Sequence, residues 1–471
     1  MKRFWLVLLS LGLIVAFSTS AMAVDVKFSG EFYAAGVYVD KGEMVKNNIF
    51  TTGAEAANTS TAFYYQRLRL NTTFVVHPGL MLITRADIME RAWGNTRSSS
   101  TVLVGGVPVS APLDTMSAGT RAENENIAFD LLYAMYISPI GVFTAGYQID
   151  GAWGTVFGDT SLPTGKVTYL FRKGPVMIGL QTGKNTENSR NAINNTIKVD
   201  RDSSFYTAWV RYNWKSGNAG FLTKYIRNAI PRGTPGDTLA PTFLEDLGVK
   251  ADVWVFIPYV KAQLGPVALQ AEFYYLWGKQ TWEGVHDLIG MTDHVNMNQM
   301  TGWIDALGDF GMFYVGGTFA YVSGDDPATD QAEGGTLSGG LDWNPCLILW
   351  NSDMTYWTRM ARGFDGTTTA GPMNNAYFLQ ARAGVRPVEK LDIMASVSWA
   401  HADKTLSAQW NGRDIGYEID LTATYKITNN LSYMLGGGYL IAGDWFKGTD
   451  VAGIAEPQNN FLVLNKLTLT F

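Results

Sequence analysis

The stretch GYEIDLTATYKIT, residues 416–428, decides the fold, because its side chains alternate strictly between apolar and polar types. The apolar face consists of Tyr417, Ile419, Leu421, Ala423, Tyr425 and Ile427. The polar face consists of Glu418, Asp420, Thr422, Thr424 and Lys426. A period of two residues is typical of a β-strand. A strand with one apolar and one charged face fits a wall between lipid and water.

The same alternation recurs along the chain, so further strands of this kind are predicted. Clear examples are the segments 24–39, 66–76, 267–277 and 391–399, in which apolar residues oppose charged, amide or hydroxyl residues. The composition agrees with this interpretation, since 13% of the residues are aromatic and 50 are glycine. Aromatic residues form girdles at the lipid interfaces of barrels, and glycines allow tight turns.

The connections between these segments alternate in length. Eight short turns are expected at residues 77–79, 139–141, 173–175, 215–218, 264–266, 308–311, 387–390 and 428–430. Nine longer polar stretches are expected near residues 41–60, 95–124, 155–163, 185–201, 229–241, 282–300, 324–373, 404–412 and 445–458. This order joins 18 strands and leaves both chain ends on the short-turn side. We therefore expect an all-β protein: a transmembrane antiparallel β-barrel of about 18 strands (16–18), with short periplasmic turns and long extracellular loops.

The longest loop, residues 324–373, contains an unusual apolar patch, WNPCLILW at residues 343–350. One interpretation is that the loop folds inward and narrows the channel. The other is that the patch forms an extra hairpin or packs inside the mouth of the barrel. The sequence leaves both open.

The N-terminal segment predicts export. Lys2 and Arg3 precede an apolar run from Leu6 to Phe17, and the small-residue motif 21–23 (AMA) follows. This layout is typical of a secretory signal peptide, and the run is too short for a spanning helix. We expect residues 1–23 to be cleaved and residues 24–471 to form the barrel. A single cysteine, Cys346, excludes an internal disulfide.

The charge balance argues against nucleic-acid binding. The signal segment carries two of the 36 basic residues and none of the 42 acidic ones, so the mature chain has 34 basic and 42 acidic residues, a net charge of −8. A mildly acidic chain without basic clusters lacks the electrostatic footprint that nucleic acids require.

Enzyme and metal motifs are absent from the sequence. It contains no HExxH, GxSxG or P-loop motif. An enzyme with its site at the rim of a barrel would need a Ser/His or Asp/His grouping, and His401 with Asp403 is the only local example. This pair alone does not define an active site, so we expect no enzyme, catalytic residue or cofactor. Two groups of residues were considered as metal ligands: His286 and His294 with Asp287 and Asp293, and the acidic loop residues Asp325, Asp326, Asp330 and Glu333. Solvated loops explain both groups better, so no metal site is predicted.

Charged residues on the polar faces are candidates for lining the lumen. They are Glu31, Arg67, Arg69, Arg211, Asp252, Glu272, Arg382, Arg386, Glu418 and Asp420. Two interpretations carry equal weight. Opposed rows of arginine and acid could create a field that orients polar solutes. Alternatively, the charges pair with one another and simply keep the lumenal wall hydrated.

The C-terminal strand carries the first resemblance to a known family. Leu467 and Leu469 alternate with Lys466, Thr468 and Thr470, and the chain stops at Phe471. This resembles the C-terminal signature by which the outer-membrane assembly machinery recognises its substrates. With the period-two pattern along the whole mature chain, the sequence resembles bacterial outer-membrane porins.

A narrower likeness is to alginate-export-type barrels of 18 strands. It rests on residues 417–425, followed by Gly438-Tyr439 and by residues 442–444 (AGD). That family exports an anionic polysaccharide through a strongly basic lumen, whereas the lumen expected here mixes basic and acidic residues. Alginate is therefore not carried over as the substrate.

The resemblance to porins implies a water-filled channel in outer-membrane lipid for passive diffusion of small hydrophilic solutes and ions. Barrels of 16–18 strands leave an open lumen, which agrees with this function. Two alternatives remain: a substrate-specific or polysaccharide-export channel, and a barrel that houses a partner protein. A homotrimer is one option for the assembly, but a trimer contact is apolar like any lipid face, so the sequence leaves the oligomeric state open.

Overall fold

The computed structural model describes residues 24–46, 60–94, 100–104, 107–111, 127–187, 202–229, 248–283, 294–358, 360–364, 368–451 and 453–471. The expected signal peptide, residues 1–23, lies outside these ranges and stays a prediction. The same holds for His286, Asp287 and Asp293 of the histidine-containing loop.

Eighteen strands form one antiparallel sheet. They are β1 (Asp25–Asp40), β2 (Thr61–His77), β3 (Leu80–Ala92), β6 (Ile127–Ser138), β7 (Gly141–Asp150), β8 (Leu162–Lys173), β9 (Val176–Thr186), β10 (Ser203–Trp214), β11 (Gly217–Asn228), β12 (Gly248–Leu264), β13 (Val267–Glu283), β14 (His294–Asp309), β15 (Phe313–Val322), β16 (Ala376–Val388), β17 (Leu391–Ala402), β18 (Asp414–Lys426), β19 (Leu431–Ala442) and β20 (Asn460–Thr470). The expected strand number is therefore confirmed.

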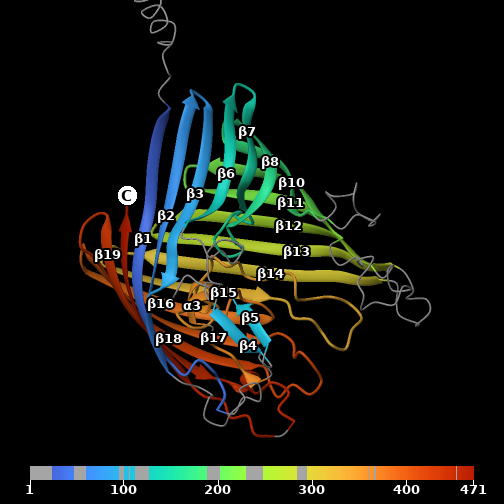
Figure 1. Cartoon of the computed structure of the whole chain (residues 1–471), viewed down its shortest axis with the longest axis vertical. Helices are drawn as coiled ribbons and strands as arrows, with labels where there is room; N and C mark the ends of the chain where they lie inside the picture. The colour runs from blue at the N-terminus through green and yellow to red at the C-terminus, as the bar shows by residue number, and fades with distance from the viewer. Residues whose placement is uncertain are drawn as a thin grey trace, which may run out of the picture.

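The sheet closes on itself, because the first strand pairs with the last. β1 pairs with β2 on one side and with β20 on the other, from Glu31 opposite Thr470 to Asp40 opposite Phe461. In Figure 1 the blue strand β1 lies beside the red C-terminal strands. Within the described part of the 18-stranded sheet, closure leaves neither β1 nor β20 as an unpaired edge strand, as a sheet in lipid requires.

The C-terminal residue completes this seam. The Phe471 N–H donates to the Gly30 carbonyl oxygen at 3.0 Å, and the Gly30 N–H donates to the Phe471 carbonyl oxygen at 2.8 Å. A Cβ at position 30 would lie 2.8 Å from the Arg69 carbonyl oxygen and 2.8 Å from the Phe471 ring, so glycine allows this close approach of the strands. Phe471 therefore joins the two ends of the chain, which its proposed role as an assembly signal did not predict.

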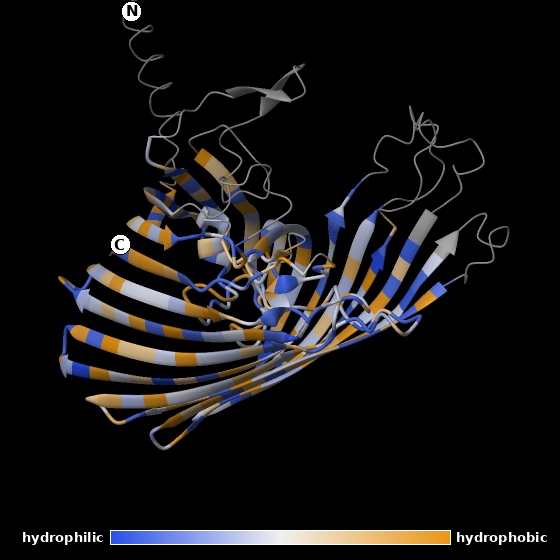
Figure 2. Ribbon diagram, turned by 90° about the horizontal axis from the view of Figure 1, so that it is seen from below, coloured by the Kyte–Doolittle hydropathy of each residue, from blue (hydrophilic) through white to orange (hydrophobic). Residues whose placement is uncertain are grey.

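The two faces of the barrel wall differ in the way that the alternation predicts. On β18, Tyr417, Ile419 and Leu421 are 47%, 48% and 57% exposed on the outer face, whereas Glu418 and Asp420 are 0% and 3% exposed inside. Figure 2 shows the resulting bands of apolar and polar residues along the strands. An apolar outer face on a closed sheet is the arrangement that lipid demands. In the described residues, no helix is long and apolar enough to cross a membrane.

Smaller elements lie in the loops. β4 (Ser100–Val104) and β5 (Val107–Ala111) form a hairpin between β3 and β6. The helix α3 (Ser352–Thr358) belongs to the long connection between β15 and β16, and the 3₁₀ helix η3 (Asp444–Lys447) follows β19. The connection that contains α3 runs over residues 323–375, close to the predicted 324–373.

Candidate functional site

Two loops fold into the lumen and are the main features of the candidate site. The first is residues 151–161, between β7 and β8. The Trp153 ring lies 5.2 Å from the rings of Trp209 on β10 and Tyr259 on β12, and its Nε1–H donates to the Ile257 carbonyl oxygen at 3.1 Å. Gly154, with φ of +66°, allows the chain to turn against the Tyr259 ring. The loop is therefore docked on the inner wall.

Glu272 of β13 holds the same loop through its carboxylate. The Thr155 N–H donates to Glu272 Oε2 at 2.6 Å, and the Thr155 hydroxyl contacts the same oxygen. The Tyr274 hydroxyl donates to Oε1 at 2.7 Å. Further along the loop, Phe157 stacks on Trp303 of β14, with 5.7 Å between the ring centroids. Buried polar groups need such partners, so Glu272 anchors the loop.

The second inward loop is residues 323–375, and its apolar patch packs against the wall. Trp343 and Trp350 both lie edge-on against Phe378 of β16, at 5.6 Å and 5.4 Å. In α3, Trp357 stacks on Tyr65 of β2 at 4.3 Å. The sequence left open whether this patch folds inward, and the structure places it inside the barrel.

A carboxylate again fixes this loop. The N–H groups of Ile348 and Leu349 donate to the two carboxylate oxygens of Glu418 on β18, each at 2.7 Å. The Gln380 side chain on β16 donates to the Pro345 carbonyl oxygen at 2.8 Å. These hydrogen bonds to side chains of the wall satisfy loop backbone groups that water cannot reach.

The two loops also contact each other. The Trp343 and Phe157 rings lie 4.9 Å apart. The Gly340 N–H donates to the Phe157 carbonyl oxygen at 2.7 Å, and the Asp342 N–H donates to the Asp159 carbonyl oxygen at 3.0 Å. The loops therefore form one continuous layer inside the barrel and reduce the space open to solutes.

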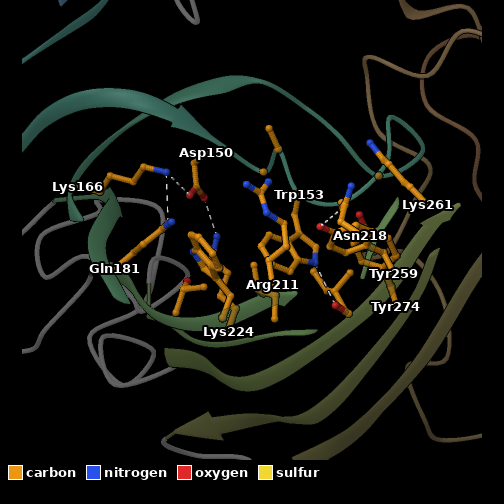
Figure 3. A pocket seen from close by; sticks show the side chains of 18 residues that line it. Asp150, Trp153, Lys166, Gln181, Arg211, Asn218, Lys224, Tyr259, Lys261 and Tyr274 are labelled. Carbon is orange, nitrogen blue, oxygen red and sulfur yellow. Dashed lines mark hydrogen bonds and ion pairs between the residues drawn. The ribbon is translucent and has the colours of Figure 1, made fainter. Parts of the chain in front are cut away.

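A cavity of about 410 Å³ lies between the first loop and the wall, and we call it the basic cavity (Figure 3). Its charged lining residues are Asp150, Lys166, Arg211, Lys224 and Lys261. Lys166 and Lys224 converge on Asp150, with Nζ to carboxylate oxygen distances of 3.1 Å and 2.7 Å. Four basic groups and one acidic group leave three positive charges in excess. Arg211 Nε has no hydrogen-bond partner among the described residues.

Most of the other arginines of the inner wall are paired with acids. Arg69 forms a two-bond pair with Asp87, with both contacts at 2.7 Å. Arg67 lies 3.5 Å from Glu90 and 4.0 Å from Glu31.

Three further pairs complete this pattern: Arg85 with Asp130, Arg382 with Asp305, and Arg386 with Asp309 and Asp392. The interpretation in which lumenal charges pair with one another therefore describes most of these arginines, whereas the lining of the basic cavity carries an excess of positive charge.

The structure places the ten predicted lumen residues unevenly. Glu31, Arg67, Arg69, Arg211, Arg382 and Arg386 lie on the inner face. Glu272, Glu418 and Asp420 also lie there, but the inward loops cover them. Asp252 was misplaced: it lies on the outer face of β12, since the buried inner face carries its neighbours Val253 and Val255. There Asp252 pairs with Lys250 at 2.7 Å and accepts a hydrogen bond from the Tyr225 hydroxyl.

The sequence analysis missed the cavity residues Lys166, Lys224, Lys261, Asp150 and Trp153. Their strands do alternate, so an inward position was readable for the lysines. Their convergence depends on which strands are neighbours and on the inward course of residues 151–161, and neither follows from local pattern.

The residues considered for enzyme or metal chemistry have other contacts. His401 stacks on Trp399 at 5.7 Å, whereas Asp403 accepts hydrogen bonds from the Gly324 N–H and the Tyr321 hydroxyl. In the acidic loop, Asp326 pairs with Lys404 at 2.8 Å, and Asp325 accepts the Glu333 N–H at 2.9 Å.

Comparisons with known proteins find solved structures that are similar to this chain. No protein-family model matches the sequence, and no curated protein matches it. Among solved structures, the chain is similar to the outer membrane protein OpdK of Pseudomonas aeruginosa, with 11% identity, a TM-score of 0.48, and 94% of this chain and 99% of that chain covered. It is also similar to OccK9 (OpdG) of Pseudomonas aeruginosa, with 12% identity, a TM-score of 0.49, and 95% and 99% covered. An anion-selective porin from Comamonas acidovorans shows 10% identity, a TM-score of 0.43, and 95% and 99% covered.

The class of the protein follows from its own strand pairing and surface. A closed antiparallel sheet of 18 strands with an apolar exterior and a charged interior is a transmembrane β-barrel of the outer-membrane type.

Proposed function

We propose that the protein is an outer-membrane porin through which small hydrophilic solutes and ions diffuse passively. The observation that carries the proposal is a closed barrel of 18 strands whose inner face is charged and whose lumen is narrowed by its own loops. Barrels of this size enclose more space than side chains fill. Diffusion down a gradient needs no cofactor, catalytic group or energy source.

The basic cavity supports a preference for anions. Its lining carries four basic groups against one acidic group, and the low-dielectric wall strengthens the resulting field. Asp150 pairs with both Lys166 and Lys224. Arg211 and Lys261 form no ion pair with the acids that the structure describes, so we propose that their charge is available to a passing anion. We propose that this cavity lies on the solute path and attracts small anions.

The alternative of a barrel that houses a partner protein is less well supported. The docked loops occupy lumenal space that a folded partner would need, and Trp343 and Trp350 are already buried against the wall. A polysaccharide exporter would need a long continuous basic track, whereas most inner-wall arginines here are paired with acids.

Conductance in planar lipid bilayers tests the proposal. The purified barrel should give stable channels, and its reversal potential in a KCl gradient should indicate chloride preference. Lys224→Gln removes one positive charge from the cavity and should shift the reversal potential toward cations.

The matched control is Lys27→Gln, which removes the same charge at the end of the barrel, where Lys27 is 68% exposed. It should shift the reversal potential less than Lys224→Gln does. Absence of any conductance from folded protein would refute the porin, and equal shifts from both variants would refute the role of the cavity.

A further inference from the structure

Three potential metal ligands meet where the long inward loop contacts the barrel wall. Cys346 of the loop faces Glu418 and Asp420 of β18, and the sulfur and one oxygen from each carboxylate lie within 4.8 Å of one another. Their side chains are buried: the residues are 4%, 0% and 3% exposed. We propose that this cluster binds a divalent ion of the zinc type, which joins the loop to the wall.

The charges of the cluster call for a cation. Two buried carboxyl groups lie side by side, and in the described part of the chain neither forms an ion pair with a Lys, Arg or His side chain; the nearby basic residue Arg382 is paired with Asp305. Among the residues that the structure describes, Asp420 Oδ1 has no hydrogen-bond partner. Buried carboxylates are costly unless they are paired or coordinate a metal. A divalent ion would neutralise both and occupy the free oxygen.

Gly438 of β19 leaves space beside both carboxylates. It is the direct partner of Asp420 across the β18–β19 ladder. A Cβ at position 438 would lie 2.7 Å from Asp420 Oδ1 and 3.3 Å from Glu418 Oε1. Any other residue would therefore fill the volume next to the two oxygen atoms.

The mixed ligand set selects the kind of ion. Calcium and magnesium take oxygen ligands, whereas zinc binds cysteine sulfur and carboxylate oxygen together. In a tetrahedral zinc site, sulfur and oxygen ligands lie about 3.6 Å apart, so the three groups need to close by about 1 Å. A water molecule would take the fourth position. Because the thiol must lose its proton, binding releases protons and weakens in acid.

The ion would act as a clamp on the loop. Cys346 lies two residues before Ile348 and three before Leu349, whose N–H groups already bind Glu418. A metal bond at Cys346 therefore fixes the part of the loop that contacts β18. The proposal concerns binding alone and does not depend on the transport function.

Metal content and spectroscopy test the proposal. The full-length barrel is refolded in detergent with Zn²⁺, freed of excess ion, and analysed for zinc per chain; Co²⁺ serves as a spectroscopic probe. We expect about one ion per chain and a thiolate-to-cobalt charge-transfer band. Cys346→Ser should abolish the band and weaken zinc binding by more than the roughly 10- to 100-fold loss that follows removal of an outer-shell partner.

Two further variants keep the test decisive. Gly438→Ala retains all three ligands but fills the space, and should also lose the ion. Asp325→Asn removes an acid in the same loop away from the cluster, and should retain it. Folding of each variant is checked by its heat-modifiable migration in gels. If the folded wild type holds no stoichiometric zinc, the carboxyl groups share a proton instead, and the proposal is wrong. It is equally wrong if Cys346→Ser binds zinc as tightly as the wild type.

Discussion

Replacing Trp343 with alanine should open the channel. Trp343 is 6% exposed and packs edge-on against Phe378 of the wall and Phe157 of the other inward loop. It therefore joins both loops to the barrel. Truncating a buried tryptophan costs about 3–5 kcal/mol. Because each 1.4 kcal/mol is a factor of ten, the ratio of docked to undocked loop falls by roughly 100- to 4,000-fold.

The opening should be local. Ile348 and Leu349 stay bound to Glu418 in the variant, so only the preceding part of the loop is released. We expect a larger single-channel conductance with frequent transitions between levels in the variant, and a single quiet level in the wild type. Single-channel recording in planar bilayers measures both quantities.

The control is Trp277→Ala, which removes a tryptophan that is 57% exposed on the outer face and contacts neither loop. It should leave the conductance unchanged. If folded Trp343→Ala gives the conductance and noise of the wild type, the inward loops do not limit the pore, and the reasoning fails.

Three other predictions concern pH, an ion pair and the seam. Burial raises the pKa of Asp159 to about 6, so the protonated carboxyl favours the docked loop at low pH, and this contribution is lost as the pH rises from about 4 to 6. Conductance should therefore rise between about pH 4 and 6, and Asp159→Asn should flatten this dependence. Arg85→Ala leaves Asp130 buried without its partner and should lower the free energy of unfolding, measured by urea titration, by about 3–5 kcal/mol. The double variant Arg85→Met with Asp130→Leu should lose less, and equal losses would contradict this. Deleting Phe471 removes two backbone hydrogen bonds to Gly30 and should lower the folding stability by about 1–3 kcal/mol, seen as a smaller folded fraction in heat-modifiability gels. Phe471→Ala keeps both bonds and should lose less, and two variants as stable as the wild type would exclude a role of Phe471 in the seam.

The strand number and the two faces of the wall were predictable, because period two is a local property of each segment. The stretch 416–428 shows this, since every apolar residue from Tyr417 to Tyr425 lies on the outer face of β18. Loop order gave the even number of strands in the same way. These features need no knowledge of distant contacts.

The misplacement of Asp252 has a physical cause. Around it the sequence reads Val253, Trp254, Val255 and Phe256, so both faces of β12 are apolar and alternation assigns no inside. The inner face is apolar because the first inward loop packs over this part of the wall, with Trp153 against Tyr259. A covered lumenal face looks like a lipid face in sequence.

The inward loops set the other limit on sequence reasoning. The alternation predicts that Glu418 faces the lumen, and it does point inward. The loop that covers it, however, comes 70 residues earlier in the chain. Trp343 and Phe157 meet although 186 positions separate them. Such contacts depend on the register of the whole barrel, which no single segment contains.

The pairing of β1 with β20 has a consequence for biogenesis. Glu31 lies opposite Thr470, so the ladder that closes the barrel joins residues 439 positions apart. Until β20 pairs with β1, the sheet has two unpaired strand edges. Their amide and carbonyl groups would be exposed to lipid without hydrogen bonds, at a cost of several kcal/mol for each group. A chain that lacks a few residues of β20 therefore cannot insert as a slightly smaller closed barrel. Insertion should therefore be all or none, with β20 required as much as the strands that precede it.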